Sequence, residues 1–467
     1  FFGSMKCVDR KRETEKLQKA INAAESQLIV VYGRRRVGKS TLIKEMLELG
    51  RDIYFQADET TVANQIHLLS KSITTVLPTF DTATYPDWRA ILEAFNHRVQ
   101  EPCTLCLDEF PYLCKSCRCL PSIIQEFWDN SSPRFNLILC GSSQQLMHST
   151  ILDEKSPLYG RCDVIMKLQP ISVSHIGEAM GLTSAREAIE HYSMWGGVPR
   201  YWKLASHYET AIESLTELLL SPDGTLSDEP NRLLRDELRD ISLSKSILTV
   251  IGYGAHRLTE IASRLKKPAT EIMLPLRRLI DMGYVEREVP FGESPKDNKR
   301  GLYKLSDTFM HTNYHFYAPH ASLIALGRGA TIARIVEKEM PTFMGSCWES
   351  LCREAVSGNE VNGVTYGMAS RWWGSASDKN TGNTKQIEVD VVALSIDKKH
   401  LLVGECKWAQ ADYAERLLAE LNKKISMMPI PKSVKHIHPV LFVRESPLGD
   451  KASGCLMPED VIALCRN

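Results

Sequence analysis

The sequence predicts an α/β protein in three folded parts: a parallel-sheet domain with a phosphate-binding loop, a winged helix, and a second α/β domain. Three observations support this prediction. A glycine-rich loop near the amino terminus lies between an apolar run and an amphipathic run. The middle of the chain has short helical patterns followed by two alternating strands. Near the carboxyl terminus, two further alternating strands carry acidic residues among Val, Ile and Leu.

The composition is that of an ordinary globular protein of several domains. Of 467 residues, 43% are hydrophobic and 24% are charged, and 57 basic side chains balance 57 acidic ones. This balance excludes a uniformly basic surface, so any nucleic-acid-binding surface must be local. No apolar run approaches the roughly 18 residues of a membrane span, so no membrane partner is expected. Thirteen cysteines without a visible signal peptide predict a reducing, cytoplasmic location.

The phosphate loop occupies residues 33–41 and fits G-x-x-x-x-G-K-[ST] without a mismatch. A strand is predicted before it over 28–32 and a helix after it over 42–49, which is the context that the motif requires. Glycines let successive N–H groups close around phosphate oxygens, and the helix N-terminus adds partial positive charge. The predicted cofactors are therefore ATP and Mg²⁺. The predicted binding residues are Gly33, Arg36, Val37, Gly38, Lys39, Ser40 and Thr41, with Lys39 on the β- and γ-phosphates and Ser40 on Mg²⁺.

A second motif of nucleotide hydrolysis lies downstream, where an apolar strand over 103–107 ends in Asp108 and Glu109. Asp108 would hold the Mg²⁺ shell, and Glu109 would orient and deprotonate the attacking water. Because strands and helices alternate, the sheet is predicted to be parallel and doubly wound, with ligands at the carboxyl ends of its strands. The other predicted strands are 51–56, 136–143 and 164–168, and the predicted helices are 9–24, 60–77 and 87–99.

Two further side chains have both a functional and a structural interpretation. Ser142 ends a buried strand, and its hydroxyl could sense the γ-phosphate or position water, or it could simply belong to a turn. Arg161 could be an arginine finger that reaches a phosphate, often from a neighbouring subunit of a homo-oligomer. The alternative is a surface arginine that precedes the strand over 164–168.

The middle of the chain has the pattern of a winged helix. Helices are predicted over 243–251, 258–265 and 269–282, followed by strands over 284–289 and 301–305 with a polar loop between them. Double-stranded DNA is therefore a predicted partner. The alternative is an interdomain lid, because winged helices also serve in that role. Pro275 inside the recognition helix is also unusual. The cations that could meet phosphates are Lys266, Lys267, Arg277, Arg278, Lys296, Lys299 and Arg300.

The last part of the chain has the constellation of a metal-dependent nuclease. A strand over 386–394 contains Asp390, and a strand over 401–408 carries Glu405 and Lys407 on one face. The two carboxylates would hold Mg²⁺ or Mn²⁺, and Lys407 would orient or activate water. Glu349 could add a ligand from the second of two helices predicted over 331–339 and 346–356. The alternative is a salt-bridged hairpin without a metal.

The chain resembles archaeal-type prokaryotic ATPases of the AAA+/STAND class, joined to a winged helix and a C-terminal domain of unknown function related to PD-(D/E)xK nucleases. The resemblance implies an AAA+-like sheet domain and a restriction-endonuclease-like α/β domain. It also implies that Arg10 and Pro199 lie near the nucleotide. Asp9 departs from the Gly common in the family, and Val389 stands before Asp390 where the motif has Pro. The motifs that carry the resemblance occupy residues 8–13, 33–41, 107–111, 140–143, 156–161, 196–199 and 404–408.

These observations predict an ATPase domain over 5–205, a helical connector over 206–242, a winged helix over 243–315 and a nuclease-like domain over 325–467. The predicted function is binding and hydrolysis of Mg-ATP as a switch on DNA. Glu109, Arg161, Ser142, Asp390, Glu405 and Lys407 are the predicted catalytic residues. The alternative function is a regulatory or signalling ATPase that acts on protein partners and keeps a catalytically silent C-terminal scaffold.

Overall fold

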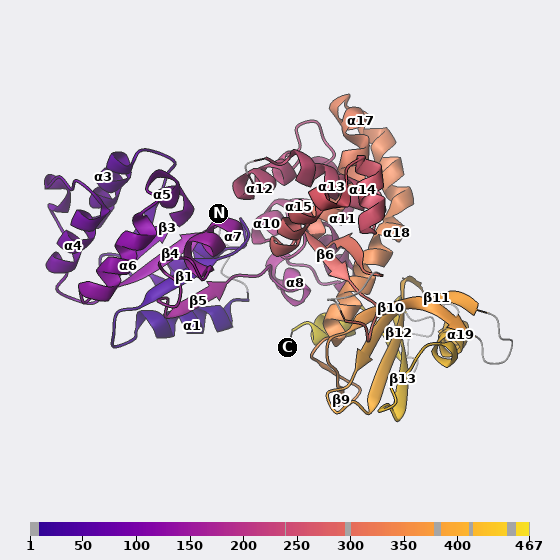
Figure 1. Ribbon diagram of the computed structural model, residues 1–467. Coiled ribbons are helices and arrows are strands. Elements are labelled where there is room, and N and C mark those ends of the chain that lie inside the picture. Colours follow the sequence, from indigo (N-terminus) through magenta and orange to yellow (C-terminus); the bar gives the residue numbers. More distant parts are fainter. Residues whose placement is uncertain are drawn as a thin grey trace. The chain divides into compact units, whose positions relative to one another are not determined.

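The computed structural model describes residues 9–238, 240–294, 300–377, 384–410, 414–445 and 454–466 (Figure 1). It divides the chain into two compact units. The first unit contains Phe1–Ile171 and two short later segments, Val198–Arg200 and Leu233–Arg239. The second unit contains Ser172–Gly197, Tyr201–Arg232 and Asp240–Asn467.

The first unit is built on a five-stranded parallel sheet of order β2-β3-β4-β1-β5 (Figure 1). β3 and β4 are buried along their whole length, which explains why they appear in the sequence as continuous apolar runs. The predicted parallel sheet is therefore confirmed. Its strands are β1 (Leu28–Tyr32), β2 (Ile53–Gln56), β3 (Cys103–Asp108), β4 (Phe135–Gly141) and β5 (Val164–Lys167).

Helices cover both faces of this sheet. One core contains Leu105 of β3 with Leu69 and Phe95 of the flanking helices, and the other contains Cys106 of β3 with Leu17 and Ile43. Successive residues of β3 thus point into opposite cores, as expected for a doubly wound sheet. The helices are α1 (Lys11–Ile21), α2 (Lys39–Met46), α3 (Val62–Ile73), α4 (Trp88–Arg98), α5 (Phe110–Ser116), α6 (Leu120–Asn130) and α7 (Gln144–Met147), with short turns η1 (Phe80–Thr82) and η2 (His148–Leu152).

The three helices and the hairpin predicted in the middle of the chain are present. Helix α13 contacts both α14 and α15, and β6 pairs antiparallel with β7, where Val285 is opposite Leu305. Ile247, Ile261 and Leu276 are buried between the helices. The elements of this region are α8 (Ile176–Met180), α9 (Ala185–Trp195), α10 (Pro199–Ala205), α11 (Ala211–Leu218), α12 (Glu229–Glu237), α13 (Ser242–Gly252), α14 (Leu258–Leu265), α15 (Ala269–Asp281), β6 (Val285–Glu288) and β7 (Leu302–Leu305), with η3 (Val173–His175) at the start.

One prediction for the following region is wrong. The two helices expected over 331–339 and 346–356 form a single helix, α18 (Gly329–Val356), with Pro341 inside it. Proline in a helix interior costs about 3 kcal/mol, but buried side chains on both sides, including Val336 and Phe343, hold the helix together. Preceding it are α16 (Thr308–Thr312), η4 (Asn313–Tyr317), η5 (Ala318–His320) and α17 (Ala321–Ala325).

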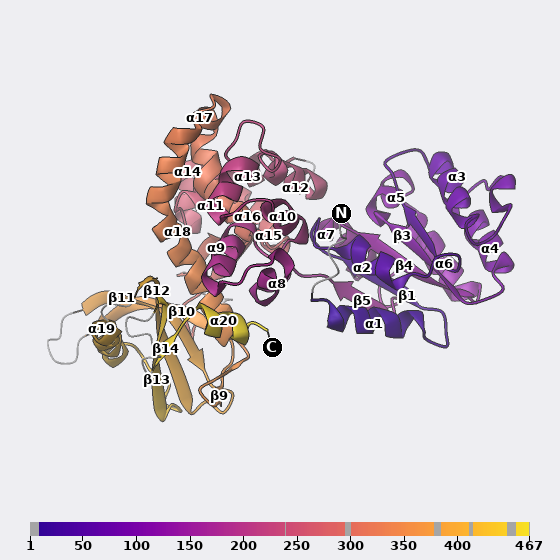
Figure 2. The same ribbon diagram turned by 180° about the vertical axis from the view of Figure 1, so that it is seen from behind.

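The carboxyl-terminal part is a second α/β region, built on a five-stranded sheet of order β10-β11-β12-β13-β14. The predicted hairpin is confirmed, since β11 and β12 are antiparallel with Val391 opposite Gly404. Leu421 of α19 packs on one face of the sheet, and Trp348 of α18 donates to the Phe442 carbonyl from the other (Figures 1 and 2). The elements are β8 (Glu360–Val361), β9 (Val364–Thr365), β10 (Ser370–Ser377), β11 (Thr384–Leu394), β12 (His400–Gln410), α19 (Ala414–Met427), β13 (His436–Glu445), β14 (Cys455–Leu456) and α20 (Pro458–Leu464).

Candidate functional site

The phosphate loop joins the carboxyl end of β1 to the start of α2. A Cβ at Gly33 would lie 2.4 Å from the Leu168 carbonyl oxygen, and Gly38 has a φ of 98°, so both positions require glycine. Lys39 is buried, and its Nζ donates to the carbonyls of Gly33 (2.9 Å) and Arg34 (3.0 Å). Burial lowers the pKa of Lys39. The loop therefore holds an ammonium group where the phosphates of a nucleotide would bind.

Ser40 and Asp108 meet at the end of β3. The Ser40 hydroxyl donates to Asp108 Oδ2 over 2.7 Å, and the Tyr54 hydroxyl donates to the same oxygen. Burial raises the pKa of Asp108, but hydrogen bonds from Cys140, Tyr54 and Ser40 outweigh it and hold that pKa below its usual value. An ionised carboxylate beside a hydroxyl is a set of oxygen ligands suited to Mg²⁺.

Glu109 has a backbone conformation that is rare for residues other than glycine. Its φ is 54°, in the left-handed region, which costs about 1 to 3 kcal/mol and is concentrated at functional sites. Its N–H donates to Asp108 Oδ1 over 2.9 Å, and its Oε1 accepts from the Ser142 hydroxyl over 2.9 Å. The carboxyl ends of β3 and β4 thus bring together the three side chains that the sequence singled out there.

The other residues predicted for the nucleotide site differ in their placement. Arg10 is buried, and its Nη2 donates to the carbonyls of Val37 (3.0 Å) and Gln169 (2.7 Å), so it lies against the phosphate loop. Arg161 Nε donates to both carboxylate oxygens of Asp129, over 3.0 and 3.1 Å. Pro199 begins α10 in the segment Val198–Arg200 of the first unit. The roles of Arg161 and Pro199 toward a nucleotide stay predictions, as does that of the exposed Thr41.

In the carboxyl-terminal sheet, Asp390 and Glu405 lie on neighbouring strands. Asp390 is buried, and its Oδ2 accepts from the Cys406 N–H over 2.9 Å. Glu405 pairs with two lysines, Lys407 at 3.0 Å and Lys424 of α19 at 2.6 Å. The sequence analysis missed Lys424, which is 19 residues from Glu405 in the chain. Both carboxylate oxygens of Glu405 are thus engaged by cations.

Glu349 of α18 lies near this pair. Burial raises the pKa of Glu349 to about 7, and the Asp390 carboxylate adds to the effect. Burial and the neighbouring Glu405 also raise the pKa of Asp390. Within the described ranges, no group of three or more His, Cys, Asp or Glu side chains is arranged as metal ligands. The metal-binding roles of these carboxylates therefore stay predictions.

Most of the cations predicted to meet DNA lie on the surface. Lys266 and Lys267 are exposed at the end of α14, and Arg277 and Arg278 are exposed on α15. Lys267 pairs with Glu271 at 2.8 Å. Arg300 pairs with Glu293, and the predicted contacts Lys296 and Lys299 lie outside the described residues.

The β6–β7 hairpin is tied to the carboxyl-terminal part through Glu288. Its carboxylate lies 3.0 Å from Lys304 Nζ, 3.5 Å from an Arg353 nitrogen and 3.9 Å from an Arg371 nitrogen. Burial raises the pKa of Glu288, but these three cations outweigh it and lower that pKa below its usual value. Because Arg353 also donates to the Asp390 carbonyl over 3.0 Å, the hairpin and the sheet share one ionic network.

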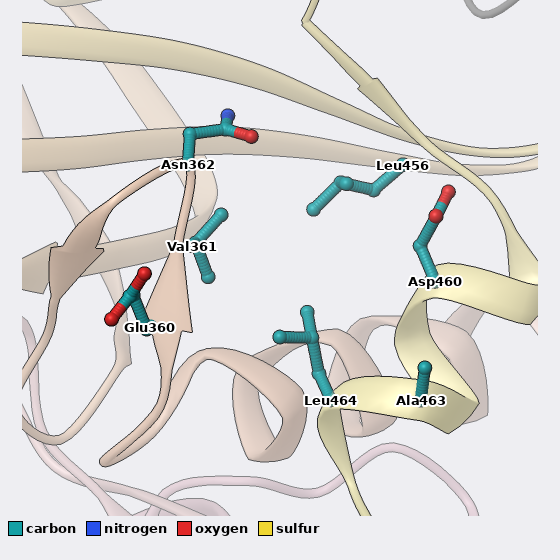
Figure 3. A pocket seen from close by; sticks show the side chains of 7 residues that line it. All are labelled: Glu360, Val361, Asn362, Leu456, Asp460, Ala463 and Leu464. Atoms are coloured by element: carbon teal, nitrogen blue, oxygen red, sulfur yellow. The ribbon is translucent and has the colours of Figure 1, made fainter.

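A pocket of about 270 Å³ lies between β8, β14 and α20 (Figure 3). Apolar and acidic side chains face it, and they are different from the residues of the predicted sites. Its lining consists of Glu360, Val361, Asn362, Leu456, Asp460, Ala463 and Leu464.

Residues 7–204 match the family described as an ATPase domain predominantly from Archaea. The amino-terminal part of the chain is an archaeal-type P-loop ATPase domain. Residues 313–419 match a family of archaeal and bacterial proteins of unknown function.

The chain is also similar to individual proteins. An uncharacterized protein of Methanocaldococcus jannaschii is 28% identical over 406 residues, which are 86% of this chain and 87% of that protein. An uncharacterized ATP-binding protein of the same organism is 49% identical over 47 residues, which are 10% of this chain and 80% of that protein. The solved structure of a Walker-type ATPase of Pyrococcus abyssi shares the fold, with a TM-score of 0.51 and 22% identity over 66% of this chain and 95% of that one.

Sequence reasoning missed one side chain at the centre of the ATPase domain's site. Tyr54 lies on β2 opposite Cys106 of β3, so its hydroxyl reaches the carboxylate at the end of β3. The available signal was an aromatic hydroxyl near the end of the strand predicted over 51–56. Across the described residues, no helix has both the length and the apolar character needed to cross a bilayer.

Proposed function

We propose that the ATPase domain binds and hydrolyses Mg-ATP and that the chain uses this cycle as a switch on DNA. The observation that supports it most strongly is the grouping at the carboxyl ends of β1, β3 and β4. Lys39 lies inside the loop, Asp108 accepts from Ser40, and Glu109 accepts from Ser142. Phosphate release by the parent and by Glu109→Gln is the test of hydrolysis.

The proposed reaction assigns one task to each of these side chains. Lys39 binds the β- and γ-phosphates, and the hydroxyl of Ser40 and the carboxylate of Asp108 hold the magnesium ion, which neutralises phosphate charge. Glu109 accepts the proton of the attacking water, while the Ser142 hydroxyl fixes the orientation of the Glu109 carboxylate. Arg161 would reach a phosphate bound by a neighbouring subunit only after its ion pair with Asp129 is broken.

For DNA, the proposal rests on α14, α15 and the β6–β7 hairpin as a winged helix. If this surface binds duplex, log K should fall with log salt by about 0.9 for each phosphate contacted. Replacing Lys266, Lys267, Arg277 and Arg278 together by alanine should weaken binding and flatten that slope. Fluorescence anisotropy of a labelled duplex at several salt concentrations measures both.

The matched control for the DNA experiment removes four exposed cations from α1, by replacing Lys11, Arg12, Lys16 and Lys19 with alanine. This variant should keep the slope of the parent. Absence of salt-dependent binding by the parent at low salt would contradict the DNA proposal. That result would favour the interdomain lid, which the ion pairs of Glu288 with Arg353 and Arg371 also support.

For the carboxyl-terminal sheet, we propose a site for Mn²⁺ or Mg²⁺ at Asp390 and Glu405. At a free Mn²⁺ concentration of about 100 Kd, binding should stabilise the full chain by about 2.7 kcal/mol. Asp390→Ala should remove this gain, and Glu415→Gln on the exposed face of α19 should keep it. Since a metal competes with protons for carboxylates, the gain should be larger at pH 8 than at pH 6. Thermal unfolding with and without Mn²⁺, at both pH values, measures this gain in stability.

A second function, that of a regulatory ATPase with a silent carboxyl-terminal scaffold, is supported by one specific observation. Lys407 and Lys424 neutralise both oxygens of Glu405 without a metal. If Mn²⁺ changes neither the unfolding temperature nor the cleavage of DNA or RNA, this alternative replaces the nuclease-like role. Metal binding without cleavage would remove the nuclease activity but keep the metal site.

A further inference from the structure

A carboxylate from a distant part of the chain lies against the turn that follows β4. Glu237, at the end of α12, accepts from the Ser143 hydroxyl over 3.0 Å and from the N–H groups of Gln144 and Gln145 over 2.9 and 3.1 Å. Glu237 is separated from these residues by more than 90 positions in the sequence. Three donors on one partly buried carboxylate make the contact specific, because both of its oxygens have defined hydrogen-bond partners.

The neighbouring residue anchors the same segment to the phosphate loop. Asp236 pairs with Arg35 at 2.5 Å, and the side chains of the two residues are 28% and 43% exposed. Leu233–Arg239 therefore belongs to the first unit, although in the chain it comes directly before α13 of the second. An exposed pair of this kind contributes little stability, about 1 kcal/mol or less. Glu237, which makes three partly buried hydrogen bonds, is the stronger anchor.

The turn that Glu237 holds also carries the partner of Glu109. Ser142 donates to Glu109 Oε1 over 2.9 Å, and the next residue, Ser143, donates to Glu237. A shift of this turn would carry the Ser142 hydroxyl away from Glu109. Displacing a catalytic group by about 1 Å can cost on the order of 100-fold in rate.

We propose that Glu237 is a positioning residue for ATP hydrolysis, which fixes the segment over 142–145 at the start of α7 so that Ser142 holds Glu109 in its reactive orientation. The inference rests on the proposed role of Glu109. Glu237 lies beyond the family match over residues 7–204, so the site is completed by a part of the chain outside the ATPase domain.

The test compares kcat and ATP affinity in the full chain. Glu237→Ala should lower kcat by about tenfold to about a hundredfold, as expected for a misplaced catalytic group. The Kd for ATP, measured by titration with a fluorescent analogue, should change by less than about threefold, because the phosphate loop is untouched. Glu237→Gln keeps one acceptor oxygen and should lose less activity than Glu237→Ala.

Two further variants distinguish a positioning role of Glu237 from a role in merely attaching Leu233–Arg239 to the rest of the first unit. Asp236→Asn removes the ion pair with Arg35 but leaves Glu237 in place, and it should lower kcat by less than about twofold. Ser143→Ala should lower kcat, and combining it with Glu237→Ala should add little, because the two side chains share one contact.

The outcomes are distinct. If Glu109→Gln removes hydrolysis but Glu237→Ala keeps the parent kcat, the positioning role is wrong and the proposed function stands. If kcat and ATP affinity fall together, or if Asp236→Asn loses as much activity as Glu237→Ala, Glu237 serves only to dock the segment. If the parent does not hydrolyse ATP, the proposed function itself fails. Should Glu237→Ala not fold, Glu237→Gln and Ser143→Ala decide the question.

Discussion

Replacement of Lys39 by alanine should abolish the stabilisation that Mg-ATP gives to the ATPase domain. For the parent, free nucleotide at about 100 Kd should stabilise the domain by about 2.7 kcal/mol. Lys39 Nζ already lies between the carbonyls of Gly33 and Arg34, where its charge meets the incoming phosphates. Thermal unfolding of the full chain over a series of Mg-ATP concentrations measures the loss.

The comparison needs a baseline for each protein. Without Lys39, the carbonyls of Gly33 and Arg34 lose a buried donor, which costs about 1 to 3 kcal/mol even without nucleotide. The nucleotide-induced shift should therefore be taken from each variant's own unfolding temperature. Lys71→Ala, at an exposed position of α3, controls for the loss of a lysine and should keep the parent shift. An undiminished shift in Lys39→Ala would place nucleotide binding elsewhere.

Glu109→Gln should lower kcat for ATP hydrolysis by a factor of about 100 or more while the variant still binds ATP. Glutamine is close in size and can accept from Ser142, so the turn after β4 keeps its partner. What is lost is the ability to accept the proton of the attacking water. Steady-state phosphate release together with an ATP titration separates the two properties.

Glu93→Gln is the control for this experiment, because Glu93 is an exposed glutamate of α4 in the same domain. Its turnover should equal that of the parent. Equal turnover in Glu109→Gln would mean that the left-handed backbone at Glu109 serves the turn into α5 rather than catalysis.

Elements whose signals are local could be predicted from the sequence. The phosphate loop, β3 with its terminal carboxylates and the helix at Leu258–Leu265 were found because their apolar patterns and end residues lie within a few positions. The parallel order of strands then fixed which side chains share an edge. This is why the sequence alone predicts Lys39, Asp108 and Ser142 at the carboxyl ends of the strands.

Contacts that join distant segments could not be predicted in this way. Nothing near Glu405 in the sequence indicates that Lys424 would neutralise its second oxygen. Helix α18 continues through Pro341 because it packs against distant parts of the chain, and this packing outweighs the tendency of proline to end a helix. Glu237 was missed for the same reason, since its three donors lie in another region of the chain.

The shared carboxylate of Glu288 has an evolutionary consequence. Lys304, Arg353 and Arg371 come from three separate elements, and all of them balance this one side chain. Loss of the carboxylate alone would remove the nearer counter-charge of the buried Arg353, which would keep only Glu349 at 4.0 Å. It would also leave Arg371 with Glu388 alone, and removing one partner from a buried ionic network is unfavourable. Relatives that lack an acid at this position should therefore also lack one or both arginines. We therefore expect these positions to change together, although up to 83 residues, from 288 to 371, separate them.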